Sequence, residues 1–279
     1  MTGGAIAAKF FEEDPHSISI ENCVFENSTS LHNGGAIYYD AGGWEYYEGP
    51  PRIMAVRNST FKDCESQFGG AILQLNGNLT VDNSDFMSNA AKYKGGAVYT
   101  SLTKLTITDS EFDDNSAGKQ AGALYFDYGE LNILNSNFTK NKVDLSGDDV
   151  ASAVYLYEAD ANIRHSRFNS SKTSVYGVYT KRAVFSNNTY DIVLLNNTED
   201  TIAIANIGVT LNLTNNSIVI DSLPSKFDLR DFGWVTRLRT RGKTVHAGYS
   251  ATLPPWNLHC LKQQALKQTF PKTISKTTN

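Results

Sequence analysis

Two short phrases recur along this chain at a fixed spacing, and that spacing constrains the fold more than any other feature. The first phrase joins two glycines to a small and an aliphatic residue, in strong copies at 3–6, 34–39, 69–72 and 95–99 and weaker copies at 121–125, 152–155 and 176–179. The second phrase is Asn-Ser-x-Phe or a close variant, in copies at 58–61, 83–86, 109–112, 135–138 and 165–168. From Gly70, Gly96, Gly122 and Ser152 to the Phe of the next Asn-Ser-x-Phe phrase is always 16 residues. A constant period in the range of about 20–50 residues predicts stacked structural repeats.

The residues between the phrases have the periodicity of short strands. Runs such as 78–81, 105–108 and 131–134 alternate apolar and polar residues, and no apolar stripe within the repeats has the spacing of a helix. A period of 26 residues built from strands and turns predicts one coil of a right-handed parallel β-helix, with about three strands per coil. The predicted fold is therefore all-β, with equivalent residues of successive coils stacked on each other.

Residues at equivalent positions of the repeat are alike, as stacking requires. One internal aromatic stack is expected from Phe25, Phe61, Phe86, Phe112, Phe138 and Phe168. A second, aliphatic stack is expected from Ile6, Ile37, Ile72, Val98, Leu124 and Val154. Structural positions that need positive φ or close backbone approach are assigned to Gly35, Gly70, Gly96 and Gly122. Amides that can satisfy turn backbone groups follow the Phe by two or three residues, at Asn27, Asn89, Asn115 and Asn141.

The paired phrases resemble the GGAI and FxxN repeats of polymorphic outer-membrane proteins and the β-helical repeats of adhesin-like surface proteins. The resemblance covers roughly residues 1–220, and we assign 1–222 to one β-helical repeat domain. It implies a non-enzymatic module on a cell surface or outside the cell, with a glycan or protein of another cell as its partner. No cofactor, metal or catalytic residue is expected.

Composition narrows the class of partner. The 279 residues carry a net charge of −4, which argues against nucleic acid because nucleic-acid binding depends on a basic surface. No apolar run reaches the length of about 18 residues that marks a transmembrane helix. Met1 is followed at once by the phrase at 3–6, which is the middle of a coil. We therefore expect that the N-terminus is cut and that the parent protein carries a signal and further coils upstream.

The cysteines and the glycosylation sequons indicate in which cellular compartment the protein is located. Cys23 precedes its Phe by two residues and Cys64 follows its Phe by three, so they do not share a column and no disulfide is expected. Nine Asn-x-Ser/Thr sequons, among them Asn58 and Asn137, fit a secreted and glycosylated surface. The alternative is that turns rich in Asn and Ser produce such triplets by chance.

One insertion interrupts the regular coils. From Gly35 to Phe61 is 26 residues, ten more than elsewhere, and the extra residues fall around 40–51. This Gly- and Pro-flanked loop carries Trp44, Tyr46 and Tyr47. Because loops on a rigid scaffold carry function and aromatic residues favour interfaces, these three residues are the predicted ligand-binding site. The alternative is that their rings only cover the adjacent wall.

A smaller irregularity extends the fifth coil between Val143 and Val150. It contains Asp144, Asp148 and Asp149, which are candidate calcium ligands. No EF-hand or nonapeptide pattern surrounds them, so we interpret them as solvated carboxylates.

The repeat pattern of the sequence ends after residue 222, and a different motif follows. Residues 223–236 resemble the first strand of a mature papain-family cysteine peptidase, in which Leu-Pro, Phe-Asp-Leu-Arg and Gly-x-Val-Thr precede the catalytic segment. The family would continue Pro-Val-x-x-Gln-Gly-x-x-Gly-x-Cys-Trp, with the Gln at the oxyanion hole and the Cys as nucleophile. The chain departs from this pattern after Thr236.

A shift of reading frame accounts for the departure. When codons are read one frame out of step from Thr236, they can spell Pro-Val-Lys-Asp-Gln-Gly-x-Asn-Gly-Ala-Cys-Trp, with Cys-Trp arising at His246-Ala247-Gly248. Residues 237–279 are therefore interpreted as an out-of-frame tail that is largely disordered. Cys260 has no family pattern around it and is not expected to be a nucleophile.

Three functional classes remain. The first is the non-enzymatic, adhesin-like surface module, a fragment of a larger exported protein. The second is a papain-like peptidase with an N-terminal β-helix, whose activity this chain would have lost. The third is a polysaccharide lyase or hydrolase on a β-helix, which would need acidic residues clustered on one outer wall. The pair Asp113-Asp114 and Lys140 lie in separate turns of the repeat and do not form such a cluster.

Overall fold

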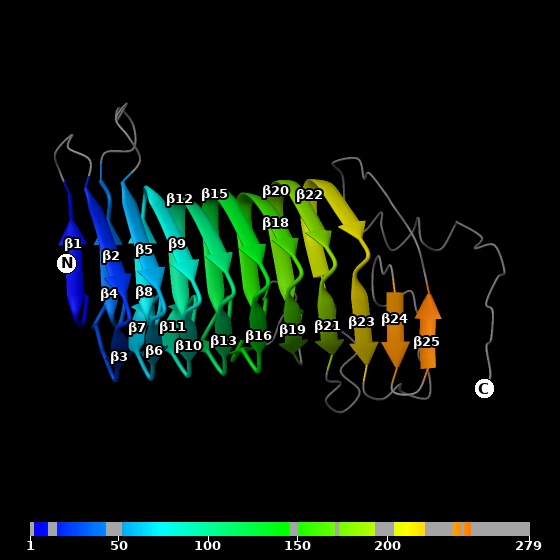
Figure 1. Ribbon diagram of the computed structural model, residues 1–279, viewed down its shortest axis with the longest axis horizontal. Helices are drawn as coiled ribbons and strands as arrows, with labels where there is room; N and C mark the ends of the chain where they lie inside the picture. The colour runs from blue at the N-terminus through cyan, green and yellow to red at the C-terminus, as the bar shows by residue number, and fades with distance from the viewer. Residues whose placement is uncertain are drawn as a thin grey trace.

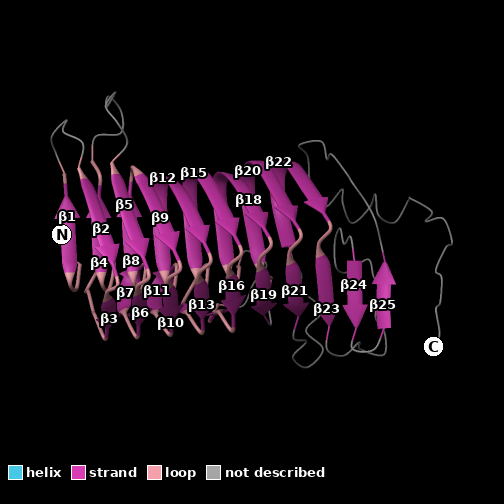
Figure 2. Cartoon of the chain, in the orientation of Figure 1, coloured by secondary structure: helices cyan, strands magenta, loops and turns pink. Residues whose placement is uncertain are grey.

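The computed structural model describes residues 3–10, 16–42, 52–145, 150–170, 173–192, 204–220, 237–240 and 243–246. In these ranges every regular element is a β-strand, and no helix occurs (Figure 2). The strands form a solenoid in which the coils lie side by side along one long axis (Figure 1). The all-β fold class is therefore confirmed.

The largest sheet has 11 strands and supplies two walls of the solenoid. Short strands of the first coils belong to one wall each: β1 (Ile6–Lys9), β4 (Ile37–Asp40) and β8 (Ile72–Leu75) to the first, and β2 (Ser17–Glu21), β5 (Ile53–Arg57) and β9 (Asn78–Asp82) to the second. Long strands of the later coils bend from the first wall into the second: β12 (Val98–Thr108), β15 (Leu124–Leu134), β18 (Val154–Arg164), β20 (Val175–Ser186) and β22 (Ile204–Thr214).

Two further sheets close the coils. The ten-stranded sheet contains β3 (Val24–Glu26), β6 (Thr60–Lys62), β10 (Asp85–Met87), β13 (Glu111–Asp113), β16 (Asn137–Thr139), β19 (Arg167–Ser170), β21 (Thr189–Ile192), β23 (Ser217–Ile220), β24 (Arg237–Thr240) and β25 (Lys243–His246). The four-stranded sheet contains β7 (Glu65–Phe68), β11 (Ala90–Lys94), β14 (Ser116–Ala117) and β17 (Lys142–Val143). All pairings are parallel except β24 with β25.

The register of the sheets confirms both predicted internal stacks. Phe86 pairs with Phe61 and Phe112, and the rings from Phe25 to Phe168 stack with centroids 4.7–5.1 Å apart and planes within 9°. Tyr190 extends this stack by one coil, which the sequence analysis missed because the residue is not Phe. The aliphatic column is also in register and continues through Val175.

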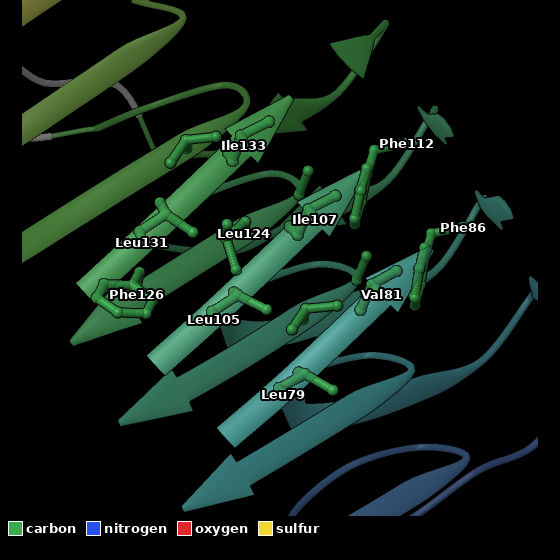
Figure 3. Packing of buried hydrophobic residues seen from close by; sticks show 14 of the residues in the cluster. Leu79, Val81, Phe86, Leu105, Ile107, Phe112, Leu124, Phe126, Leu131 and Ile133 are labelled. Atoms are coloured by element: carbon green, nitrogen blue, oxygen red, sulfur yellow. The ribbon is translucent and has the colours of Figure 1, made fainter. Parts of the chain in front are cut away.

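The core fills the space between the walls with side chains from facing strands. Figure 3 shows Leu105 and Ile107 of the second wall pointing toward the layer that carries Leu124 and Phe126 of the first wall. These four side chains are fully buried. Close packing of such apolar side chains is the main stabilising term of the fold.

The two glycines of each phrase have different roles. Gly95 has a φ of +66°, so it makes the left-handed turn at the corner. A Cβ on Gly96 would lie 2.0 Å from the carbonyl oxygen of Gly122, so this second glycine permits the close approach of adjacent coils. The same contact recurs at Gly35, Gly70 and Gly122, which confirms their structural assignment.

Buried asparagines satisfy the backbone of neighbouring coils, as predicted for three of the four positions. Asn115 Nδ2 donates to the carbonyl of Phe86 at 2.9 Å and to Asn141 Oδ1 at 3.0 Å. Asn89 repeats the arrangement one coil earlier. Asn27 differs, because it lies two rather than three residues after its Phe and is an exposed residue with a φ of +53°.

A serine ladder explains the second residue of the Asn-Ser-x-Phe phrase, which the sequence analysis did not interpret. The hydroxyl of Ser110 accepts from the amide of Ser84 at 3.1 Å and donates to the carbonyl of Thr108 at 2.7 Å. The amide of Ser110 in turn donates to the hydroxyl of Ser136. Each serine thus links two coils and also satisfies a turn carbonyl of its own coil.

The structure differs from the sequence analysis at the start of the tail. Residues 237–240 and 243–246 form β24 and β25, where we expected little order. The physical reason is that β23 ends the regular sheet with unpaired backbone groups, and an extended segment such as β24 can pair with them. Residues 223–236 and 247–279 lie outside the described residues, so the papain-like segment and the rest of the tail stay predictions.

Candidate binding surface

The bend between the two walls of the large sheet is one of several corners at which successive coils adopt positive φ. At this line five successive coils place a residue in the left-handed conformation: Asn76, Leu102, Tyr128, Glu158 and Tyr179 have φ angles between +48° and +62°. A bulky residue with positive φ is unusual and strained. The side chain of Asn76 is buried at the bend, whereas those of Leu102, Tyr128 and Tyr179 are 41%, 39% and 61% exposed.

A ladder of tyrosines supports the bend from the outer face of the first wall. Tyr99, Tyr125, Tyr155 and Tyr176 stack with centroids 5.1–5.6 Å apart and planes within 14°. Ala121 and Ala151 pack against this ladder and help to bury it. The ladder is therefore a second, smaller apolar core outside the coils, and it fixes the strands that carry the bend.

Three tyrosines and one glutamate gather where the bend crosses β15, β18 and β20. The ring of Tyr157 lies 5.7 Å from that of Tyr128 at an interplanar angle of 78° and 5.8 Å from that of Tyr179 at 85°. The hydroxyl of Tyr128 donates to Glu158 Oε1 at 3.3 Å. We name Tyr128, Tyr157, Glu158 and Tyr179 the bend cluster.

The bend cluster has perpendicular rings because its residues alternate between two columns. Tyr128 and Tyr179 occupy the left-handed position of their coils, whereas Tyr157 lies one residue earlier and Glu158 takes the left-handed position. If the three rings shared one column, they would stack in parallel, as the rings of the tyrosine ladder do. This exchange places one carboxylate and three rings on a small outer surface.

Charged groups beside the bend cluster include one acid and one base. Burial raises the pKa of Asp127, and the nearby Lys94 opposes this shift. Burial, assisted by Asp127, raises the pKa of Tyr99 to about 12. Lys94 Nζ lies 2.9 Å from the hydroxyl of Tyr125 and 4.2 Å from its ring centroid. The surface around the bend cluster therefore combines aromatic rings with carboxylates, whereas the ammonium group of Lys94 contacts the tyrosine ladder.

The predicted aromatic insertion leaves the solenoid at this same bend. The described stem of the insertion consists of the end of β4 and of residue 52, which precedes β5. In the next coil, Asn76 and Gly77 alone connect the two equivalent strands. The buried guanidinium of Arg52 donates to the carbonyls of Ala41 and Gly42, so it ties the two sides of the stem together. Trp44, Tyr46 and Tyr47 lie outside the described residues, and their binding role stays a prediction.

The acids considered for catalysis or metal binding are paired across coils. Asp113 accepts from Thr139 and lies 3.3 Å from Lys140, and Asp114 lies 3.2 Å from Lys142. The amide of Asp144 donates to the carbonyl of Ala117, while Asp148 and Asp149 lie outside the described residues. Among the residues that the structure describes, no group of three His, Cys, Asp or Glu side chains could hold a metal ion.

A shallow hollow of about 310 Å³ lies on the ten-stranded sheet, away from the bend. Its lining residues are Glu111, Asn137, Thr139, Lys140, Arg167 and Asn169. Arg167 and Lys140 already pair with Asp191 and Asp113. Asn137 and Asn169 are sequon asparagines, so this hollow is a surface for glycan attachment if the chain is glycosylated.

The two described cysteines are free, as expected. Cys64 is buried at the coil position that Asn89 fills in the next coil, and its amide donates to Asn89 Oδ1. Burial raises the pKa of its thiol. Cys64 is therefore a core residue without the exposure that a nucleophile needs.

Comparison with known proteins supports the architecture. Residues 12–150 match the family model described as a right handed beta helix region. No curated protein and no solved structure matches the chain. In the described ranges no helix has the length and apolar character needed to cross a membrane. The parallel register, the stacked core and the family match together identify the repeat part of this chain as a right-handed parallel β-helix.

Proposed function

We propose that this chain is a non-enzymatic, adhesin-like repeat module that acts on a cell surface or outside the cell. The observation that carries the proposal is the line of exposed apolar and aromatic side chains along the bend, held in strained backbone conformations on a rigid wall. Strain of this kind persists where the surrounding structure enforces it and often marks a functional surface. The resemblance of the repeats to surface proteins favours the same role.

The bend also connects the proposal to the aromatic insertion. The insertion that carries Trp44, Tyr46 and Tyr47 leaves the solenoid on the same line as the bend cluster, which favours a shared recognition role. Exposed tyrosine and tryptophan side chains supply large contact areas at low entropic cost. The partner would be a glycan or protein of another cell.

The two enzymatic alternatives have less support. A papain-like peptidase needs a reactive cysteine, and the described Cys23 and Cys64 lie in the repeats, where no peptidase pattern surrounds them. A polysaccharide lyase or hydrolase needs unpaired acids on one outer wall, whereas Asp113 and Asp114 form ion pairs with lysines. The fold by itself does not confer either activity.

Retention of the purified full chain on intact cells and glycan arrays tests this proposal. We expect wild-type protein to be retained and the triple variant Trp44→Ala, Tyr46→Ala, Tyr47→Ala to be retained less, with unchanged circular dichroism. A thiol-directed peptidase probe and a pectin cleavage assay should give no signal. Labelling by the probe, cleavage of pectin, or the absence of retention on every surface would overturn the proposal.

A further inference from the structure

The ring geometry of the bend cluster differs from that of the two parallel aromatic stacks. The tyrosine ladder and the phenylalanine stack hold successive rings nearly parallel. In the bend cluster the ring planes cross at 78° and 85°, with Glu158 in the same left-handed column as Tyr128 and Tyr179. Stacked rings cover each other's faces, whereas rings that meet at nearly right angles keep part of their faces uncovered.

The side chains of the bend cluster favour a cationic ligand. The face of an aromatic ring carries negative electrostatic potential, and several rings together bind quaternary ammonium groups. Glu158 adds a carboxylate that contacts the hydroxyl of Tyr128, and Asp127 adds a second carboxylate next to Tyr128 in the chain. A sugar ring would need a flat platform, which rings at nearly right angles do not provide.

The cluster is also accessible. Tyr128 and Tyr179 are 39% and 61% exposed, and Tyr157 and Glu158 are partly exposed between them. From these contacts we infer that the bend cluster binds the trimethylammonium end of a choline-type headgroup. The inference rests on the proposed function and specifies its ligand.

The sequence offers a matched substitution for the test. Leu102 occupies the left-handed bend position in β12, so leucine is tolerated there without loss of the coil. The variants Tyr128→Leu and Tyr179→Leu therefore remove a ring while they keep an apolar residue at the bend. Leu31→Ala removes an exposed side chain away from the bend and serves as the control.

The experiment is titration of the full chain with choline and with 3,3-dimethylbutan-1-ol, its neutral isostere, followed by tyrosine NMR shifts. We expect choline to bind at least about fivefold more tightly than the isostere, since only choline gains the cation–π attraction. Tyr128→Leu, Tyr179→Leu and Glu158→Gln should each weaken choline binding about two- to fivefold. Each variant removes one exposed cation–π or ionic contact, and the loss of one such contact weakens binding by about that factor. Leu31→Ala should bind choline as wild type does.

Equal affinity for choline and the isostere, or unchanged affinity in both Tyr→Leu variants, would overturn the inference. Retention on cells, measured with the same preparations, separates this result from the proposed function. If retention persists while choline and the isostere are not distinguished, the ligand class is wrong and the adhesive role stands. If choline binds as expected but retention fails on every surface, the site is real and the adhesive role is wrong.

Discussion

At the scale of single residues, the solenoid depends on side chains that complete the hydrogen bonding of the neighbouring coil. Asn115 is buried and bonds to the backbone of Asn89 and Phe86 and to the side chains of Asn89 and Asn141. A buried group that loses its partner costs about 1–3 kcal/mol. The asparagine columns are therefore energetically as important as the apolar stacks.

Replacing Asn115 by leucine should be strongly destabilising although leucine has a similar size. The variant leaves the amide of Asn89 and the carbonyl of Phe86 without partners, so we expect a loss of about 3–5 kcal/mol in the free energy of unfolding. Urea unfolding measures the loss, with Asn137→Leu on the exposed face of β16 as the control. Equal losses in the two variants would contradict the role of the asparagine column.

The carboxyl of Asp127 makes stability depend on pH. Burial raises its pKa in the folded protein, despite the opposing charge of Lys94. The folded state therefore holds this proton more tightly than the unfolded chain, and the stability that protonation confers is lost as pH rises through the raised pKa. Asp127→Asn should be more stable than wild type at pH 7, and the difference should vanish at acidic pH. Thermal unfolding across this range checks the sign, and a less stable variant at pH 7 would refute it.

At the scale of elements, the corner phrase separates turn geometry from coil packing. Gly95 provides the positive φ, and the equivalent Ala121 adopts a φ of +60°, so alanine can make the same turn. Gly96 faces the carbonyl oxygen of Gly122 across the coils, where a Cβ has no room. A Cβ on Gly95 would lie 2.3 Å from the carbonyl oxygen of Val98, but this contact is within one turn, which Ala121 shows can accept alanine, whereas the Gly96 contact joins two coils.

The pair of variants Gly95→Ala and Gly96→Ala tests this difference. We expect Gly95→Ala to cost about 1 kcal/mol, as left-handed alanine does. Gly96→Ala should cost about 3 kcal/mol or more because it pushes two coils apart. The comparison needs only urea unfolding of both proteins. A larger loss in Gly95→Ala would reverse our assignment of the two positions.

Much of the fold could be predicted from the sequence because a parallel solenoid repeats one coil. Equal spacing from Gly96 to Phe112 and from Gly122 to Phe138 requires equal register, and the internal stacks follow from that register. The bend cluster could not be predicted in the same way. Tyr128, Tyr157 and Tyr179 stand at two different coil positions, and only the left-handed backbone at the bend brings them together. The pairing of β24 with β23 also depended on an open sheet edge, which local periodicity does not show.

At the scale of the whole molecule, the solenoid ends where the sequence changes its character. The frame interpretation predicts that the codons of His246-Ala247-Gly248 contain Cys-Trp in the shifted frame. Sequencing the DNA across the Thr236 codon checks this, and restoring the frame should yield a chain that reacts with a thiol-directed peptidase probe. Codons that cannot spell Cys-Trp would contradict the interpretation, as would labelling of the present chain at Cys260.

The whole solenoid acts, in this account, as a rigid carrier that presents one recognition line along its bend. The most direct measurement is retention on cells of the full-chain variant Tyr128→Leu, Tyr157→Leu, Tyr179→Leu beside the control variant Val24→Ala, Leu31→Ala, which removes exposed side chains away from the bend. Both variants should keep the circular dichroism of wild type. The account predicts that the bend variant loses most of its retention and that the control keeps it. Equal retention of a folded bend variant and wild type would contradict the central claim.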